Sequence, residues 1–300
     1  MKPWRVASCV SLLLLSLLSG SAGTLAQFRT VFGDLDVELY DQQKPVTVQN
    51  FERLVQSGAY QNTFFHRVVP GFVAQGGGYF TTIPFSTNNF APPWSYLGQV
   101  PSFGAITNEF SVGPRFSNTN GTIAMAKIDG NPNSATCQWF FNLANNSTNL
   151  DNQNGGFTVF GYVIRDTGPT NWGGVLGLFN LLSDFYGLED MQYWYGTGDP
   201  VAGLFQDLPV TYFFPDVPWY SDLFYVDISL LNVQVTVLTN GNRKVAWNSV
   251  SNTLNYVEFT TNFPPVWNLL LSTNGNGSTI NVTDSSPKGL RRFYRVRVPF

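Results

Sequence analysis

The sequence predicts a mainly β protein: a closed antiparallel β-barrel capped by two helices, followed by a small β-sandwich-like domain. Two observations predict this class. Short runs of alternating apolar and polar residues recur along most of the chain, separated by Gly, Pro, Asn and Asp, which is typical of strands joined by turns. Only two segments change to the 3.6-residue period of a helix, one early and one late in the first 233 residues.

The first residues have the order of a secretory signal peptide. Lys2 and Arg5 precede the apolar run 10–18, and small residues follow as far as Ala26. Because a spanning helix needs about 20 apolar residues, this run is too short to span a bilayer comfortably. We expect cleavage after Ala26 or Ala22, no membrane span afterwards, and a secreted or periplasmic location. An uncleaved anchor is the alternative.

Charge and cysteine content restrict the partners and the means of stabilisation. Removal of residues 1–26 reduces the basic residues from 16 to 14 against 19 acidic ones, and this mildly acidic balance argues against a nucleic-acid partner. Cys137 is then the one remaining cysteine, so no intramolecular disulfide can form. Its bulky apolar neighbours predict a buried, unreactive thiol. We expect a monomer.

The first domain is expected over residues 27–233. The alternation in 28–40 predicts a hairpin with its turn at Gly33-Asp34. A helix is predicted over 44–60, because Pro45 suits its first turn and Gly58 its end. The chain is then expected to form two short strands broken at Pro70-Gly71, a long loop over 79–119, strands over 121–128, 138–143 and 157–164, a helix over 173–187, an aromatic-rich loop, and a strand from residue 223.

Residues 234–300 are expected to form a separate β-rich module. Short alternating strands follow one another at a spacing of roughly ten residues, joined by turns such as Asn240-Gly241-Asn242, as in a small sandwich. Basic residues alternate with apolar ones in the last segment, which predicts a solvated basic face. These basic residues are Lys288, Arg291, Arg292, Arg295 and Arg297.

Residues 64–78, FFHRVVPGFVAQGGG, carry the strongest functional signal. They contain the chain's one histidine, His66, beside Arg67 in an otherwise almost entirely apolar stretch. A buried and unpaired charge is costly, so an arginine at this place needs a reason. Strand alternation puts the two side chains on opposite faces. We expect His66 to be a packed structural residue and Arg67 a functional one.

This segment resembles the signature of the cyclophilin-type peptidyl-prolyl isomerases, and the resemblance extends over about residues 28–233. The order of the segments matches the family: an NF-containing helix, FHRVVPGFVAQGGG, GTIAMA, PNSATCQWFFNL and LDNQNGGFTVFG. The resemblance implies a cyclophilin-like barrel and an enzyme that rotates X-Pro peptide bonds. It also implies proline-containing polypeptides as partners, a role in the folding of exported proteins, and no cofactor.

The resemblance further implies a role for each site residue. Rotation of an X-Pro amide must pass a barrier of ~18–20 kcal/mol. Arg67, always charged, would donate toward the prolyl nitrogen and so weaken the C–N double bond. Arg67, Gln75 and Phe72 are the expected catalytic residues, with Gln75 holding the substrate carbonyl and supporting Arg67. The expected substrate-binding residues are Val73, Phe140 and Leu150 in the proline slot, Ala126 and Lys127 beside the extended peptide, and Gln138 and Phe157 on the rim.

Four positions depart from the family pattern. Val73 replaces a common methionine, and Lys127 replaces an asparagine used mainly through its backbone. Asn149 stands where many members have a tryptophan, and Phe157 where many have a histidine. Because the last two positions shape the pocket rim, we expect weak cyclosporin binding with isomerase activity retained.

Other chemistries lack the residues that they need. With one histidine and one mature cysteine, the chain has no set of zinc ligands, and no nucleophile-elbow sequence accompanies His66. No metal is expected. Two alternatives to catalysis stay open. One is a non-catalytic cyclophilin-fold module that binds proline-containing segments. The other is adhesion to polysaccharide through the aromatic-rich insertions at 79–96 and 193–225.

Overall fold

The computed structural model describes residues 24–183, 187–211, 216–231, 233–249, 254–262, 266–276, 278–285 and 291–297. Most of the expected signal peptide, residues 1–23, lies outside the described residues, as does Lys288. Within the described ranges, no helix is long and apolar enough to cross a membrane.

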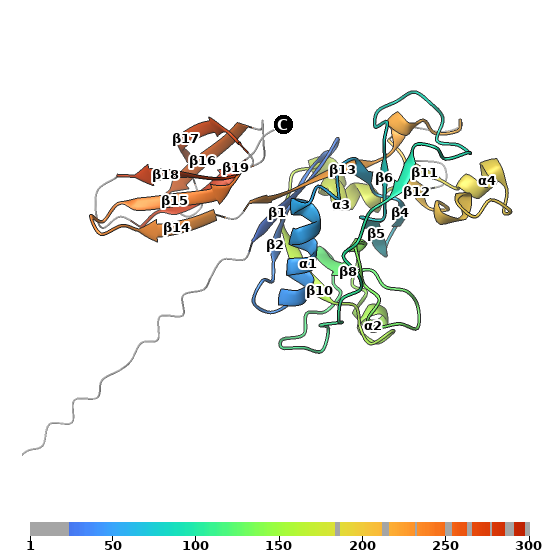
Figure 1. The fold of residues 1–300 in the computed structure, drawn as a ribbon, viewed down its shortest axis with the longest axis horizontal. Helices are drawn as coiled ribbons and strands as arrows, with labels where there is room; N and C mark the ends of the chain where they lie inside the picture. The colour runs from blue at the N-terminus through green and yellow to red at the C-terminus, as the bar shows by residue number, and fades with distance from the viewer. Residues whose placement is uncertain are drawn as a thin grey trace, which may run out of the picture.

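An antiparallel sheet of eleven strands forms the body of the first domain (Figure 1). In spatial order its strands are β4 (Arg67–Val69), β5 (Val73–Gly76), β9 (Trp139–Asn142), β8 (Thr122–Met125), β10 (Val159–Asp166), β2 (Gly33–Leu39), β1 (Leu25–Thr30), β13 (Tyr225–Leu231), β3 (Thr63–Phe64), β6 (Tyr79–Thr81) and β7 (Leu97–Gln99). Only Phe65 and His66 separate β3 from β4, so one continuous segment pairs with β13 at one end and with β5 at the other. The sheet therefore curls back onto itself, and the mainly β barrel architecture is confirmed.

Aromatic side chains fill the barrel interior. The ring of Phe28 lies 5.0 Å from that of Trp139 and 5.1 Å from that of Phe141, and all three side chains are fully buried. Helix α1 (Pro45–Gln56) covers one opening with Phe51, whose ring is 5.8 Å from that of Phe28. Helix α3 (Gly174–Phe179) contributes Phe179 on the other side. The two expected helical caps are present, and α2 (Ser147–Leu150) and α4 (Met191–Tyr195) are short additions.

Several boundaries differ from the sequence prediction: the expected loop 79–119 contains β6 and β7, and the turn of the first hairpin and the end of the late helix lie at other residues. The hairpin turns at Val31-Phe32, because the Thr30 hydroxyl donates to the Gly33 carbonyl and accepts from the Phe32 N–H, while Gly33 already belongs to β2. The late helix ends at Phe179 and not at Gly187. Gly187 has a φ of +77° and forms a bridge with Ser183, so its left-handed conformation closes a turn well after the helix.

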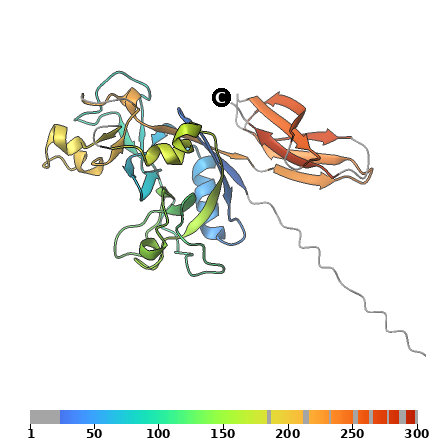
Figure 2. The same ribbon diagram turned by 180° about the vertical axis from the view of Figure 1, so that it is seen from behind.

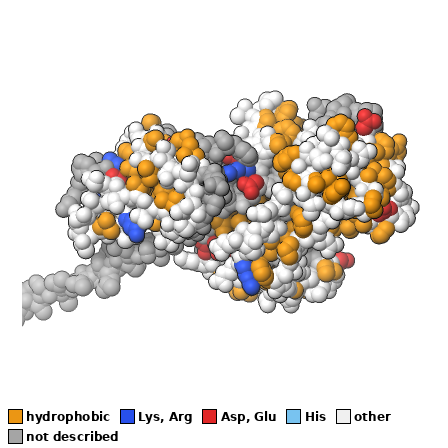
Figure 3. Space-filling model, turned by 45° about the horizontal axis from the view of Figure 1, so that its top comes forward, with side chains coloured by type: hydrophobic (Ala, Val, Ile, Leu, Met, Phe, Trp, Pro, Cys, Tyr) orange, Lys and Arg blue, Asp and Glu red, His pale blue; other side chains and the backbone are white. Residues whose placement is uncertain are grey.

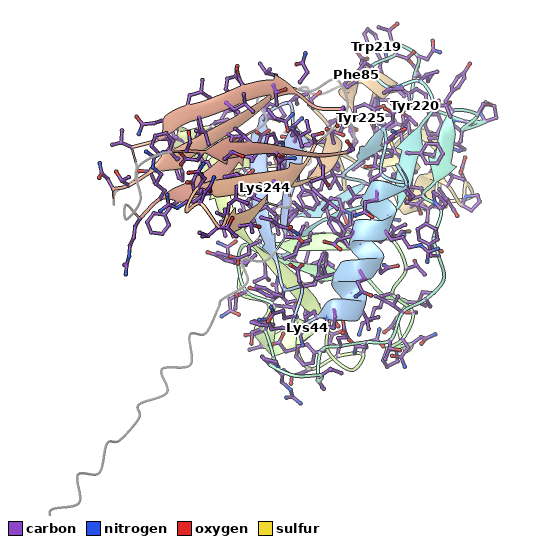
Figure 4. The ribbon with its side chains drawn as sticks, turned by 60° about the vertical axis from the view of Figure 1, so that its left-hand side comes forward. Lys44, Phe85, Trp219, Tyr220, Tyr225 and Lys244 are labelled. Atoms are coloured by element: carbon purple, nitrogen blue, oxygen red, sulfur yellow. The ribbon has the colours of Figure 1, made fainter. Side chains whose placement is uncertain are left out.

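The two insertions form a second core beside the barrel. Together with the residues that flank them, they form β6, β7, α4 and the short hairpin of β11 (Leu188–Glu189) and β12 (Leu208–Pro209). Their buried side chains pack on Phe64 and Tyr225 of the barrel and include Phe90, Trp94, Phe205, Leu208 and Tyr220. Figure 4 shows Phe85, Trp219, Tyr220 and Tyr225 gathered at the end of this domain away from Lys44. We call the buried side chains that pack with Phe64 and Tyr225, among them Phe90, Trp94, Phe205, Leu208 and Tyr220, the insertion core. It accounts for many of the aromatic residues that suggested adhesion.

The C-terminal module is made of two three-stranded antiparallel sheets (Figure 2). One contains β14 (Val233–Val237), β15 (Arg243–Asn248) and β18 (Thr279–Asp284), and the other contains β17 (Asn268–Asn274), β16 (Leu254–Thr260) and β19 (Phe293–Arg297). Val245 and Trp247 of the first sheet pack with Val257 and Val296 of the second, as in a sandwich. The sequence prediction missed β17.

The expected solvated basic face of β19 is wrong for the two arginines whose contacts the structure gives. Arg292 forms an ion pair of 2.9 Å with Asp284, and its guanidinium lies 3.9 Å from the centre of the Phe259 ring. Arg295 pairs with Glu258 at 2.6 Å. Glu258 lies opposite Arg295 on the neighbouring strand β16, whereas Asp284 reaches Arg292 from β18 of the other sheet.

Candidate active site

The signature strands present Arg67 on the outer face of the barrel. Arg67 lies opposite Gln75 on β5, Gln75 lies opposite Phe140 on β9, and Phe140 lies opposite Ala124 on β8. Since residues paired across neighbouring strands point to the same face, the four side chains form one row. The next residue along each strand is buried in the barrel core: Val68, Ala74, Phe141 and Ile123. The row therefore points away from the barrel core.

An apolar cluster continues this row and is called here the apolar slot. Its buried members are Val73, Ala124, Phe140, Leu150 and Val159, and Tyr40, Phe72, Phe116, Ala126 and Phe157 pack against them. All six apolar residues that the resemblance assigned to the groove are in this set. The other four members were missed: Ala124, Val159, and Tyr40 and Phe116, whose rings stack at 4.1 Å. Alternation along 28–40 pointed Tyr40 away from the core, and Phe116 lies in a segment that was expected to be loop.

Buried amide side chains hold the slot in shape. Asn146 donates to the Phe72 carbonyl at 2.8 Å and to the Asn142 side chain at 2.8 Å. Asn142 in turn donates to Asn118, whose own amide donates to the Phe157 carbonyl. Each amide is buried and satisfied, so the network fixes loops that contribute Phe72 and Phe157. The sequence offered no signal for this beyond a richness in Asn that is typical of turns.

Gln75, Gln138 and His66 form a second polar unit at the edge of this row. Gln75 Nε2 donates to Gln138 Oε1 at 2.7 Å, and the side chains of Gln138 and His66 both border Gly78. His66 is buried, with its ring 5.0 Å from that of Tyr79. Desolvation, together with the charge of Arg67, lowers the pKa of His66 to about 3. His66 is therefore neutral at physiological pH and packed, as expected for a structural residue.

Arg67 is half-exposed and has an acidic partner that the sequence did not indicate. Its Nε atom lies 3.2 Å from Oδ2 of Asp207, a residue of the second insertion. That insertion was expected to be an aromatic-rich loop. Arg67 thus stands between Gln75 on its own sheet and a carboxylate that is 140 residues further along the chain.

Lys127 contributes its side chain as well as its backbone. Its Nζ atom donates to the carbonyls of Asn154 and Gly156, at 2.7 and 2.6 Å, and lies 4.6 Å from the centre of the Phe157 ring. Burial lowers the pKa of Lys127 to about 8. The backbone N–H of Ala126 donates to the Gln138 carbonyl, so this N–H cannot also serve a bound peptide. Lys127 therefore fixes Phe157 and its loop at the rim.

The described part of the chain holds no group of three or more His, Cys, Asp or Glu placed to bind a metal ion. Cys137 is buried, and burial raises the pKa of its thiol, in keeping with the unreactive cysteine that was expected.

Comparison with known proteins gives the family. The model of the family "Cyclophilin type peptidyl-prolyl cis-trans isomerase/CLD" matches residues 25–169. A peptidyl-prolyl cis-trans isomerase of Acinetobacter baylyi is 39% identical over 162 residues, which cover 54% of this chain and 77% of that protein. Peptidyl-prolyl cis-trans isomerase A of Dickeya dadantii is 36% identical, over 53% of this chain and 78% of its own. A crystal structure of a Cryptosporidium parvum cyclophilin-type isomerase aligns with a TM-score of 0.40 and 21% identity, over 69% of this chain and 98% of that one. The chain therefore belongs to the cyclophilin-type peptidyl-prolyl cis-trans isomerases and is an enzyme of that class.

Proposed function

We propose that the chain rotates X-Pro bonds in polypeptide segments that lie along the outer face of β5, β8 and β9, and that Arg67 is the catalytic donor. The observation that carries this proposal is the single row of Arg67, Gln75 and Phe140 beside the apolar slot. The guanidinium of Arg67, with its several fixed donors, thus lies beside the apolar slot. Rotation of a prolyl amide needs both a donor for the prolyl nitrogen and an apolar site for the proline ring.

The reaction needs selective stabilisation of the twisted amide. In the proposed complex the apolar slot holds the proline ring, with Phe72 and Phe140 in contact with it. Arg67 donates toward the prolyl nitrogen, whose lone pair becomes available only when the amide leaves planarity. Binding that is stronger for the twisted form than for either planar isomer lowers the barrier. Gln75 directs one amide N–H at Gln138, so it would hold the substrate carbonyl with the other.

The test compares two arginine variants in a protease-coupled assay on a short, blocked Ala-Pro peptide. Arg67 and Arg165 are matched, since their side chains are 39% and 37% exposed and each is ion-paired with an aspartate. Arg67→Ala is expected to reduce kcat/KM by about 10²–10³, the effect of removing a donor that acts in the transition state. Arg165→Ala should keep the wild-type rate. Equal rates for all three proteins, near the uncatalysed rate, would remove the enzymatic proposal and favour the non-catalytic binding module.

We also propose a secreted or periplasmic location, a monomeric state and a role in the folding of exported proteins. The support for the location is the charged, apolar and small-residue order of residues 1–26. Fractionation of cells that express the full chain tests the location, and sedimentation tests the monomer. The folding role predicts that refolding of an exported protein with a slow prolyl phase is faster with wild-type protein than with the Arg67→Ala variant.

A further inference from the structure

The ion pair between Arg67 and Asp207 joins the proposed catalytic donor to a part of the chain that the family model does not match. The model matches residues 25–169, whereas Asp207 belongs to the second insertion, beside β12. The two side chains are 39% and 40% exposed, so neither is buried by the contact.

The insertion holds Asp207 firmly at this place. Its neighbours Phe205 and Leu208 are both fully buried in the insertion core. Its own carbonyl accepts a hydrogen bond of 2.8 Å from the N–H of Val68, the residue that follows Arg67 on β4. The backbones of the two partners are therefore linked directly, and the position of the carboxylate beside Arg67 does not depend on a flexible loop.

The contact engages one edge of the guanidinium. Asp207 lies on Nε, which leaves the donors of the two Nη atoms for a substrate. A planar guanidinium whose Nε is fixed has a defined direction for its remaining donors. A half-exposed ion pair of this kind contributes little to folding stability, because solvent screens both charges. Its consequence lies in the orientation of Arg67 and not in stability.

We infer that Asp207 is a positioning residue, supplied by the insertion, that orients Arg67 for donation toward the prolyl nitrogen. The inference rests on the proposed function, because it concerns the same arginine. Asp207 itself need not touch the substrate. Catalysis in this chain thus depends on a segment outside the part that the family model matches.

The experiment compares Asp207→Asn with Asp190→Asn in the full chain. Asp190 lies just before the same insertion and caps α4 by accepting from the Gln192 N–H, which Asn also does, so the control changes the charge equally. Asp207→Asn should lower kcat/KM about three- to tenfold, as expected for an orienting contact worth about 1 kcal/mol. The dissociation constant of an Ala-Pro peptide should not change, since orientation acts in the transition state. Asp190→Asn should match the wild type in both measurements.

Salt and NMR separate positioning from a merely structural role. Because salt screens half-exposed charges, 1 M NaCl should bring the wild-type rate toward that of Asp207→Asn and leave the variant unchanged. The Nε–H resonance of Arg67 should shift in Asp207→Asn and not in Asp190→Asn. An unchanged or faster rate in Asp207→Asn would overturn the inference, as would a loss explained by a lower Tm with the Arg67 resonance unmoved. An inactive wild type would instead overturn the proposed function.

Discussion

Arg67 and Gln75 lie directly opposite each other on β4 and β5, and the amide of Gln75 is held in turn by Gln138 at 2.7 Å. Arg67, the proposed donor, thus has Gln75 beside it on the same face of the sheet, and Gln138 fixes the orientation of Gln75. The family resemblance implied that all three residues belong to the site, but the hydrogen bond between the two glutamines comes from the pairing of β5 with β9.

The glutamine pair should act as a unit. Gln138→Ala is expected to lower kcat/KM about three- to tenfold, because loss of one hydrogen bond, about 1 kcal/mol, releases Gln75. Gln75→Ala should have an effect at least as large. The double variant should be little worse than Gln75→Ala, since contacting residues are not additive. A product of the two single effects in the double variant would show that the residues act independently.

His66 should make stability depend on pH. Its folded pKa of about 3 lies below the unfolded value of about 6.5, so between these values only the unfolded chain binds the proton. The free energy of unfolding therefore has its full value above pH 6.5 and falls as the pH decreases toward 3. At pH 5 it is lower by about 2 kcal/mol. Urea unfolding of His66→Gln should show a shallower dependence over this window. As His66 is the chain's one histidine, an imidazole NMR signal that titrates near pH 6.5 would contradict this.

Glu109 should stabilise the start of α1. Its carboxylate accepts from the Thr47 N–H and hydroxyl, both at 2.7 Å, while its carbonyl accepts from the buried Lys44. Glu109→Gln should lower the free energy of unfolding by about 1–3 kcal/mol, because it places an NH₂ group against donors in a buried site. Asp129→Asn, at an exposed turn, is the matched control and should unfold like the wild type. Equal Tm values for both variants would show that the cap contributes little.

The rim should decide cyclosporin binding. Asn149 lies exposed on α2, next to Leu150 of the apolar slot. We expect weak binding by the wild type and about tenfold tighter binding by Asn149→Trp, since a rim indole adds apolar contact worth about 1.4 kcal/mol. Thr148→Trp, also exposed on α2, should have no effect. Calorimetry measures all three, and tight binding by the wild type would contradict the expectation.

The mature chain should begin at Gly23. Of the two cleavage sites expected from the sequence, Ala26 lies inside β1 and is fully buried, and Thr24 accepts from the Leu39 N–H at 2.8 Å. Cleavage after Ala26 would remove these contacts from the barrel, whereas cleavage after Ala22 keeps them. Intact mass spectrometry of the exported protein gives the answer directly, and a chain beginning at Gln27 would contradict this prediction.

Local pattern alone determined much of this protein. Alternation predicted most barrel strands, and Pro45 and Gly58 marked the ends of α1. The family resemblance implied Arg67, Gln75 and six residues of the apolar slot. Strands, turns and helix ends can be predicted from the sequence because each depends on a pattern of only a few neighbouring residues. The end of α3 was wrong, because an apolar stripe also satisfies a buried turn.

Only the tertiary structure decided which distant residues surround the site. Asp207 reaches Arg67, Phe116 stacks on Tyr40, and Lys127 holds Phe157 at the rim. The first two contacts join segments far apart in sequence, and their existence depends on strand register and on how the insertions fold onto the barrel. A local period carries no information about either. The sequence alone thus predicted the residues of the proposed catalytic face, and barrel closure with the insertion core decided which distant residues lie against it.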